Sequence, residues 1–110
     1  MRKLALLLAA AILPACNSRT ERDHVHVSVS NQGTTESILV HTEVRRWGES
    51  DVVRDDVAAP GTTLLSDYDN VTRMALRIYR VSDDLKLFDE FWTADDLSHQ
   101  GDWVTVSVTP

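Results

Sequence analysis

In this 110-residue sequence, the side chains best suited to chemistry are those of one cysteine and a few histidines. Cys16 is the only cysteine, and it directly follows an apolar run near the N-terminus. His24 and His26 alternate with valines, His41 lies in a later alternating segment, and His99 lies in a polar stretch. A thiolate is a nucleophile, and imidazole is a common metal ligand. The sequence therefore offers two candidate chemistries, modification of a thiol and metal binding by histidines.

The N-terminal segment has the composition of a secretory signal peptide. Arg2 and Lys3 precede residues 4–15, an apolar run of twelve that ends in small residues. This order of charge, apolar core and small residues is typical of a signal peptide. A transmembrane helix needs about 20 apolar residues, and Pro14 would disturb a continuing helix. A buried helix of a cytosolic protein is the alternative, which the preceding cations disfavour. The sequence predicts a signal peptide over residues 1–15.

The end of this segment resembles the lipobox of bacterial lipoproteins. Leu13-Pro14-Ala15-Cys16 has Leu three places before the cysteine and a small residue just before it. It departs from the family pattern at Pro14, where Ala, Ser, Thr or Val is usual. The resemblance implies cleavage between Ala15 and Cys16, a diacylglyceryl group on the Cys16 thiol and acylation of the new amino terminus. Two or more acyl chains hold a protein stably on a bilayer.

The residues after the lipobox predict where the domain resides. Asn17 follows the cysteine, and in lipoproteins a residue other than Asp at this place implies the outer membrane. Residues 16–23 are predicted to be the lipidated cysteine and a polar tether, with one domain over residues 24–110. We expect a lipid-anchored protein of the bacterial cell envelope, at the outer membrane and facing the periplasm.

The charge of the cleaved chain limits its partners. Nine Lys and Arg would face seventeen Asp and Glu, a formal charge of −8. Nucleic-acid binding needs basic patches, so this composition disfavours it. An acidic domain is also repelled by anionic lipid. We therefore expect contact with the membrane only through the lipid, and partners among other envelope proteins.

Hydrophobic alternation predicts an all-β domain. Period-two patterns bounded by turn residues recur along the chain, as in an immunoglobulin-like antiparallel β-sandwich of about seven strands. The order SVSNQG, ILVHTEVRRWG, VAAPGTT is similar to small immunoglobulin-like modules of envelope proteins. Residues 67–70 are predicted to be an Asx-type turn. The predicted strands are 24–30, 37–47, 52–57 at an edge, 62–66, 71–81, 85–92 and 103–109, with a helical turn over 93–98.

The longest alternation, residues 71–81, divides its side chains between two faces. A helix is the rival interpretation because Met, Ala, Leu and Arg favour helices, but the alternation favours a strand. Three apolar residues are predicted to point inward and three others outward, where Arg77 could pair with Glu43 or Asp89. The inward set is Met74, Leu76 and Ile78, and the outward set is Arg73, Arg77 and Tyr79.

A metal site is the alternative to a simple binding module. If the first two strands form a hairpin with Val27 opposite Val40, His26 lies opposite His41 and near His24. Cross-strand Cβ atoms are about 4.5–5.5 Å apart, close enough for histidines to share Zn or Cu. Solvated outer-face histidines are the simpler interpretation, and a slip of one residue would remove the cluster.

The other candidate sites have less support in the sequence. Acidic pairs such as Asp55-Asp56 could serve a hydrolase, but solvated turn and cap residues explain them better. Trp47, Trp92 and Trp103 could form an exposed binding surface or pack at the core and its rim. We expect no enzymatic activity and no cofactor besides the covalent lipid, with Zn or Cu as the alternative. The predicted function is a membrane-anchored binding or structural module, and the alternative is a periplasmic metal-binding lipoprotein.

Overall fold

The computed structural model describes residues 21–110, which form six strands and one short helix. The predicted signal peptide, Cys16 and most of the predicted tether lie outside the described residues. In chain order the elements are β2 (Arg22–Asn31), β3 (Ile38–Arg46), β4 (Val52–Ala58), β5 (Thr63–Arg80), β6 (Lys86–Thr93), α1 (Ala94–His99) and β7 (Trp103–Val108). The prediction of an all-β domain is confirmed.

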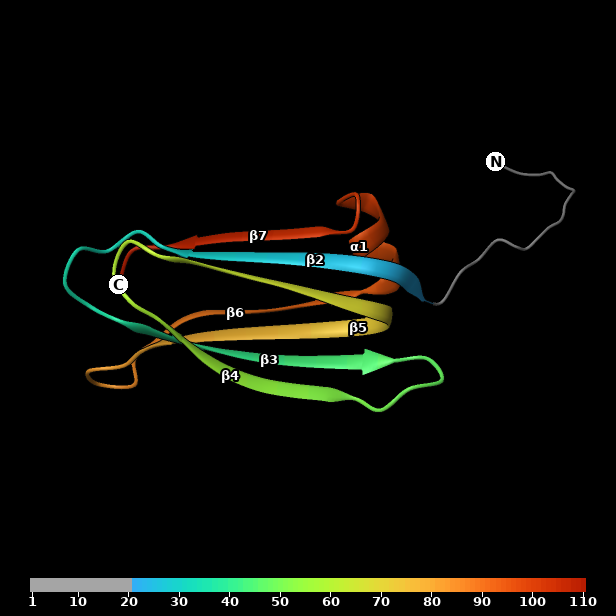
Figure 1. Ribbon diagram of the computed structural model, residues 1–110, viewed down its shortest axis with the longest axis horizontal. Coiled ribbons are helices and arrows are strands. Elements are labelled where there is room, and N and C mark those ends of the chain that lie inside the picture. Colours follow the sequence, from blue (N-terminus) through green and yellow to red (C-terminus); the bar gives the residue numbers. More distant parts are fainter. Residues whose placement is uncertain (1–20) are drawn as a thin grey trace, which may run out of the picture.

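Strand β5 connects all the other parts of the sheet. Its first part pairs with β2, from Thr63 to Val71, and its second part pairs with both β3 and β6. β7 adds to β2 in parallel, and β4 adds to β3 in antiparallel fashion. Figure 1 shows the result as two layers, with β2 and β7 in one layer and β3, β4 and β6 in the other.

β5 can serve both layers because it bends sharply at Asn70. This residue has a φ of 56°, in the left-handed region that Asn adopts more readily than most residues. Its carbonyl accepts a hydrogen bond from the Trp47 N–H (2.8 Å), and its side-chain Nδ2 donates to Glu49 (2.6 Å). The bend is thus fixed from the β3–β4 connection.

The core lies between the layers and is built by the predicted alternation. Val25, Val27 and Val29 of β2 are buried, and so are the alternate valines of β7. From the other layer, β5 contributes the predicted inward set, each member at most 1 % exposed: Met74, Leu76 and Ile78. Because these residues form one cluster, apolar burial holds the two layers together.

Two predictions about pairing and turns are wrong. β2 and β3 do not form a hairpin: β2 pairs with β5 and β7, and β3 pairs with β4 and β5. The predicted turn over residues 67–70, which would separate two strands, is also absent, because β5 runs on through Asp67 and Asp69. Only Asn70 takes a turn conformation. The acidic residues are compatible with a strand because they point outward and meet histidines across the sheet.

A buried asparagine explains why the chain crosses between layers after β2. Asn31 is 1 % exposed, and its Nδ2 donates to the carbonyls of Glu36 (2.8 Å) and Ala58 (3.1 Å). Its Oδ1 accepts from the Gly33 N–H (2.9 Å). The polar side chain is therefore satisfied, as burial requires. It ties the end of β2 to the connecting loop and to the end of β4.

The predicted helical turn near the C-terminus is confirmed as α1. Thr93 caps it: the Thr93 hydroxyl accepts from the Asp96 N–H (3.2 Å), and the Asp96 carboxylate accepts from the Thr93 N–H (3.0 Å). This capping box satisfies two backbone donors. Within residues 21–110, no helix has the length and apolarity to span a bilayer.

The bend predicts a specific sensitivity at Asn70. We expect Asn70→Val to lower the free energy of unfolding by about 1–2 kcal/mol more than Asn70→Gly, because a β-branched residue is strained at positive φ. Both variants lose the hydrogen bond to Glu49, so their difference isolates the backbone. Urea denaturation measures it. Equal stability of the two variants would contradict the role assigned to the bend.

Candidate functional site

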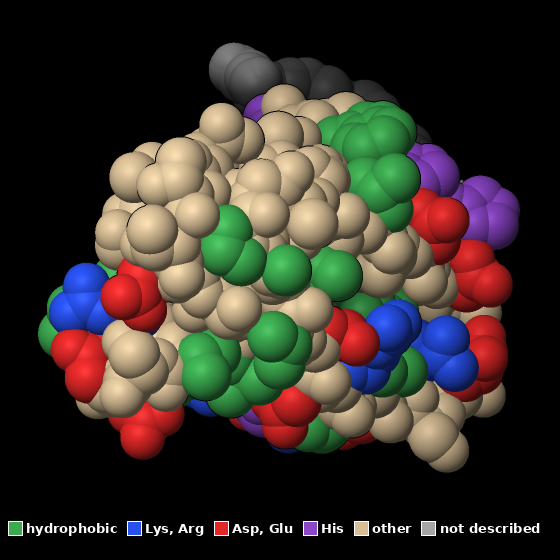
Figure 2. All heavy atoms as spheres, turned by 60° about the vertical axis from the view of Figure 1, so that its left-hand side comes forward, with side chains coloured by type: hydrophobic (Ala, Val, Ile, Leu, Met, Phe, Trp, Pro, Cys, Tyr) green, Lys and Arg blue, Asp and Glu red, His purple; other side chains and the backbone are tan. Residues whose placement is uncertain are grey.

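The outer faces of both layers carry the charged side chains. On the face in Figure 2, basic side chains lie beside acidic ones with apolar groups between them. Several large apolar side chains are exposed as well, including Trp47 at 65 % and Phe91 at 62 %. Three surfaces combine charged, polar or aromatic side chains: the outer face of β4-β3-β5-β6, the outer face of β2, and the groove between β6 and β7.

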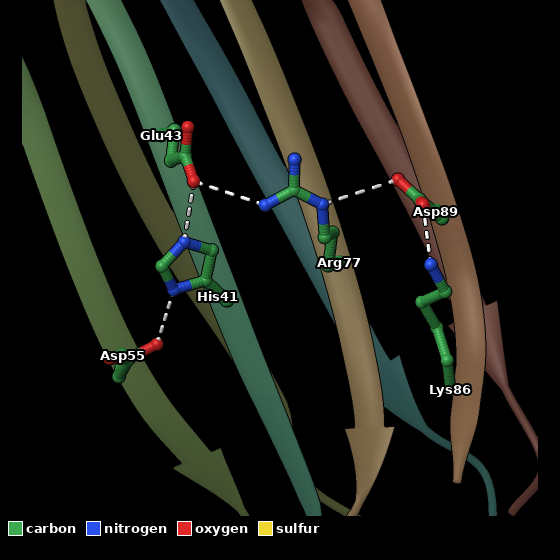
Figure 3. Close-up of polar contacts among 6 residues, drawn as sticks. All are labelled: His41, Glu43, Asp55, Arg77, Lys86 and Asp89. Carbon is green, nitrogen blue, oxygen red and sulfur yellow. Dashed lines mark hydrogen bonds and ion pairs between the residues drawn. The ribbon is translucent and has the colours of Figure 1, made fainter.

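A row of charges crosses the outer face of the β4-β3-β5-β6 layer (Figure 3). His41 on β3 lies between two carboxylates, with Nδ1 2.6 Å from Asp55 and Nε2 2.8 Å from Glu43. Because both ring nitrogens face acceptors, the geometry favours the doubly protonated imidazolium. These hydrogen bonds raise the pKa of His41, the one to Glu43 most.

The row continues through Arg77 of β5. Its guanidinium lies 3.0 Å from Glu43 and 3.5 Å from Asp89, and Lys86 of β6 lies 2.8 Å from Asp89 (Figure 3). The predicted pairing of Arg77 with Glu43 or Asp89 is confirmed with both. Hydrogen bonds lower the pKa of Glu43, chiefly that from His41, and the pKa of Asp89, chiefly that from Lys86. The row is thus a self-neutralised network on an exposed face.

A shallow depression adjoins this row at Ala75, whose side chain is small. Ala75 lies between Glu43 and Phe91 in the cross-strand register. Arg73 and Arg77 flank it on β5. The carboxylates here have lowered pKa values, whereas a general acid needs a raised one. The depression can offer charged and aromatic contacts to a ligand, but its acids are tuned for ion pairing.

The histidines of β2 lie on the opposite outer face from His41. The Nδ1 of His24 contacts Asp69 (2.7 Å), and the Nδ1 of His26 contacts Asp67 (2.5 Å). The ring of His26 also stacks on Trp103, with centroids 4.6 Å apart.

The predicted three-histidine arrangement does not form, because the hairpin that would assemble it is absent. Within residues 21–110, no group of three or more His, Cys, Asp or Glu side chains is arranged so that it could hold a metal ion. The fourth histidine, His99, lies at the end of α1 and contacts the Asp95 carbonyl (2.8 Å).

The third surface is a groove between the last strand of each layer. Among residues 21–110, β6 pairs only with β5 and β7 pairs only with β2, so no described strand closes the side between them. The groove is lined by Phe88 and Trp92 of β6, which are half-buried against the core and stacked at 6.3 Å. Glu90 lies between them on the same face of β6. Across the groove runs β7.

Sequence reasoning missed this groove and the aspartates that hold the β2 histidines. The alternation in FDEFW did contain a signal, because Phe88, Glu90 and Trp92 are spaced to share one face. The prediction for the tryptophans is met in part: Trp92 packs at the rim of the core, whereas Trp47 and Trp103 are largely exposed.

No protein-family model, curated protein or solved structure matches this chain.

The network around His41 predicts a pH-dependent contribution to stability. The pKa of His41 is raised above its ordinary value of 6.5 in the folded state. Its contribution is therefore complete below that value and is lost as the pH rises through the folded pKa. We expect the stability advantage of the wild type over His41→Gln to shrink between pH 6 and pH 9, measured by urea denaturation.

A second variant separates this effect from other titrations. Asp55→Asn removes the negative charge of one of the two acceptors, so the NMR titration of His41 should shift to lower pH. A wild-type His41 that titrates at or below pH 6.5, or one that does not respond to Asp55→Asn, would contradict the network.

Proposed function

We propose that this chain is a lipid-anchored, non-enzymatic binding or structural module of the bacterial envelope, with an immunoglobulin-like sandwich as its folded domain. The observation that carries the anchor is Leu13-Pro14-Ala15-Cys16 at the end of a charged and then apolar N-terminal segment. The pattern supports acylation of Cys16 at the outer membrane, with the domain facing the periplasm.

The start of the folded domain fits this proposal. β2 begins at Arg22, so residues 17–21 separate Cys16 from the first strand. An extended chain of this length spans at most about 20 Å. A lipid on Cys16 would therefore keep the domain close to the bilayer, and acidic side chains would disfavour adsorption on anionic headgroups.

The described surfaces support binding over catalysis. The carboxylates beside the Ala75 depression form ion pairs, and their pKa values are lowered. The groove between β6 and β7 combines aromatic walls with an open strand edge. Strand edges and aromatic grooves are common protein-recognition elements.

The anchor is tested by replacing Cys16. We expect Cys16→Ser to abolish incorporation of labelled palmitate in living cells and to move the protein from the membrane pellet to the soluble fraction. Acyl chains contribute about 0.8 kcal/mol per buried CH2, so their loss removes the membrane affinity. Ser18→Ala, two positions away, is the matched control and should remain labelled. A Cys16→Ser protein that still sediments with membranes refutes the proposal.

A further inference from the structure

The open edge of β7 presents unpaired backbone groups. The His26 N–H donates to the Asp102 carbonyl (2.9 Å), and the Gln32 N–H donates to the Val108 carbonyl (2.7 Å). Between these ends, the parallel ladder directs alternate residues of β7 toward β2. The backbone N–H and C=O groups of Thr105 and Ser107 therefore point away from β2, where no strand among residues 21–110 pairs with them.

β7 also lacks the protection that the other outer strands have. Charged side chains on an edge strand discourage pairing with further strands. β4 carries Arg54 and Asp56, an ion pair at 3.1 Å that lies on its inward face, and β6 carries Lys86 and Asp89. The sequence of β7, WVTVSV, contains no charged residue and no proline. Of the strands that end the layers, β7 is the one suited to accept another strand.

The groove beside this edge specifies what the incoming strand must carry. Phe88 and Trp92 offer apolar surface on either side of Glu90. Glu90 forms no ion pair with residues 21–110, although its strand neighbour Asp89 pairs with Lys86 and Arg77. A strand in the groove would reduce the access of water to Glu90. A carboxylate losing water requires a positive partner.

We infer that the groove binds an extended segment of a partner protein, which adds to β7 and places a Lys or Arg against Glu90 between two apolar side chains. Recognition would combine main-chain hydrogen bonds to Thr105 and Ser107 with side-chain contacts at alternate positions. The acidic charge of the chain, −6 over all its residues, favours such a cationic segment. A second copy fits less well, because its β7 would supply no cation to Glu90.

This inference deepens the proposed binding function by naming its site and partner class. The probe is a seven-residue strand, Ser-Val-Thr-Lys-Thr-Val-Ser, appended to Pro110 of the full chain through a flexible Gly-Ser linker. Tethering gives an effective concentration on the order of millimolar, so weak pairing is detected. A matched probe has Glu in place of Lys. Each is placed in the wild type and in Glu90→Lys.

Hydrogen exchange of the Thr105 and Ser107 amides is the readout. In the wild type, we expect the Lys probe to slow their exchange about tenfold more than the Glu probe, because opposite charges select the partner. In Glu90→Lys the order of the two probes should reverse. Asp89→Asn, on the same strand but the opposite face, is the control and should keep the wild-type order.

A second variant tests the backbone pairing itself. Thr105→Pro removes an edge N–H without removing a bond to β2, and proline is tolerated on edge strands. It should abolish the protection of Ser107 by the Lys probe, whereas Thr105→Ala should retain it. Equal exchange with both probes, or protection on another edge, overturns the inference. So does a probe-free chain that is already protected and sediments as a dimer, because a second copy then occupies the groove. None of these results depends on acylation of Cys16.

Discussion

The fold depends on one bent strand that has neighbours in both layers. β5 forms hydrogen-bonded ladders with β2, β3 and β6, so the registers of the two layers are set by a single segment that turns at Asn70. The left-handed conformation of that residue, held by Trp47 and Glu49, lets a continuous strand reverse without a long loop. Each part of β5 directs apolar side chains into the space between the layers. These side chains pack together in the core.

The sequence indicated which residues of each strand face the core, but not which strands lie side by side. Alternation placed the β2 valines, Met74 and Leu76 inside, and Arg77 outside beside Glu43 and Asp89, as the structure has them. Period two reports which side of a sheet a residue occupies; it carries no information about which strand lies alongside. The hairpin of β2 with β3, and with it the three-histidine cluster, was wrong for that reason. The cross-layer junction depends on Asn31, whose burial becomes visible only when Glu36 and Ala58 surround it.

For polar residues between apolar runs, the sequence alone did not distinguish a turn from a continuing strand. Asp67 and Asp69 have turn-like composition, yet both lie within β5 because each contacts a histidine of β2 across the ladder. Polar side chains on the outer faces thus find partners inside the domain, as ion pairs in the row through His41 and as hydrogen bonds between these histidines and aspartates. The side between β6 and β7 differs, because it combines two aromatic rings and the carboxylate of Glu90 with an uncharged strand edge. The contrast between matched faces and this groove is the basis for assigning binding to the groove.

Site-specific photocrosslinking in the cells that make the protein tests most directly whether this domain works through the groove. Benzoylphenylalanine replaces Phe88, which lines the groove, or Phe91, which is 62 % exposed on the opposite face of the same strand. The account predicts an adduct from position 88, absent from position 91, whose crosslinked peptide is an extended segment with a central Lys or Arg. Adducts from position 91 alone, or none from position 88, would contradict it.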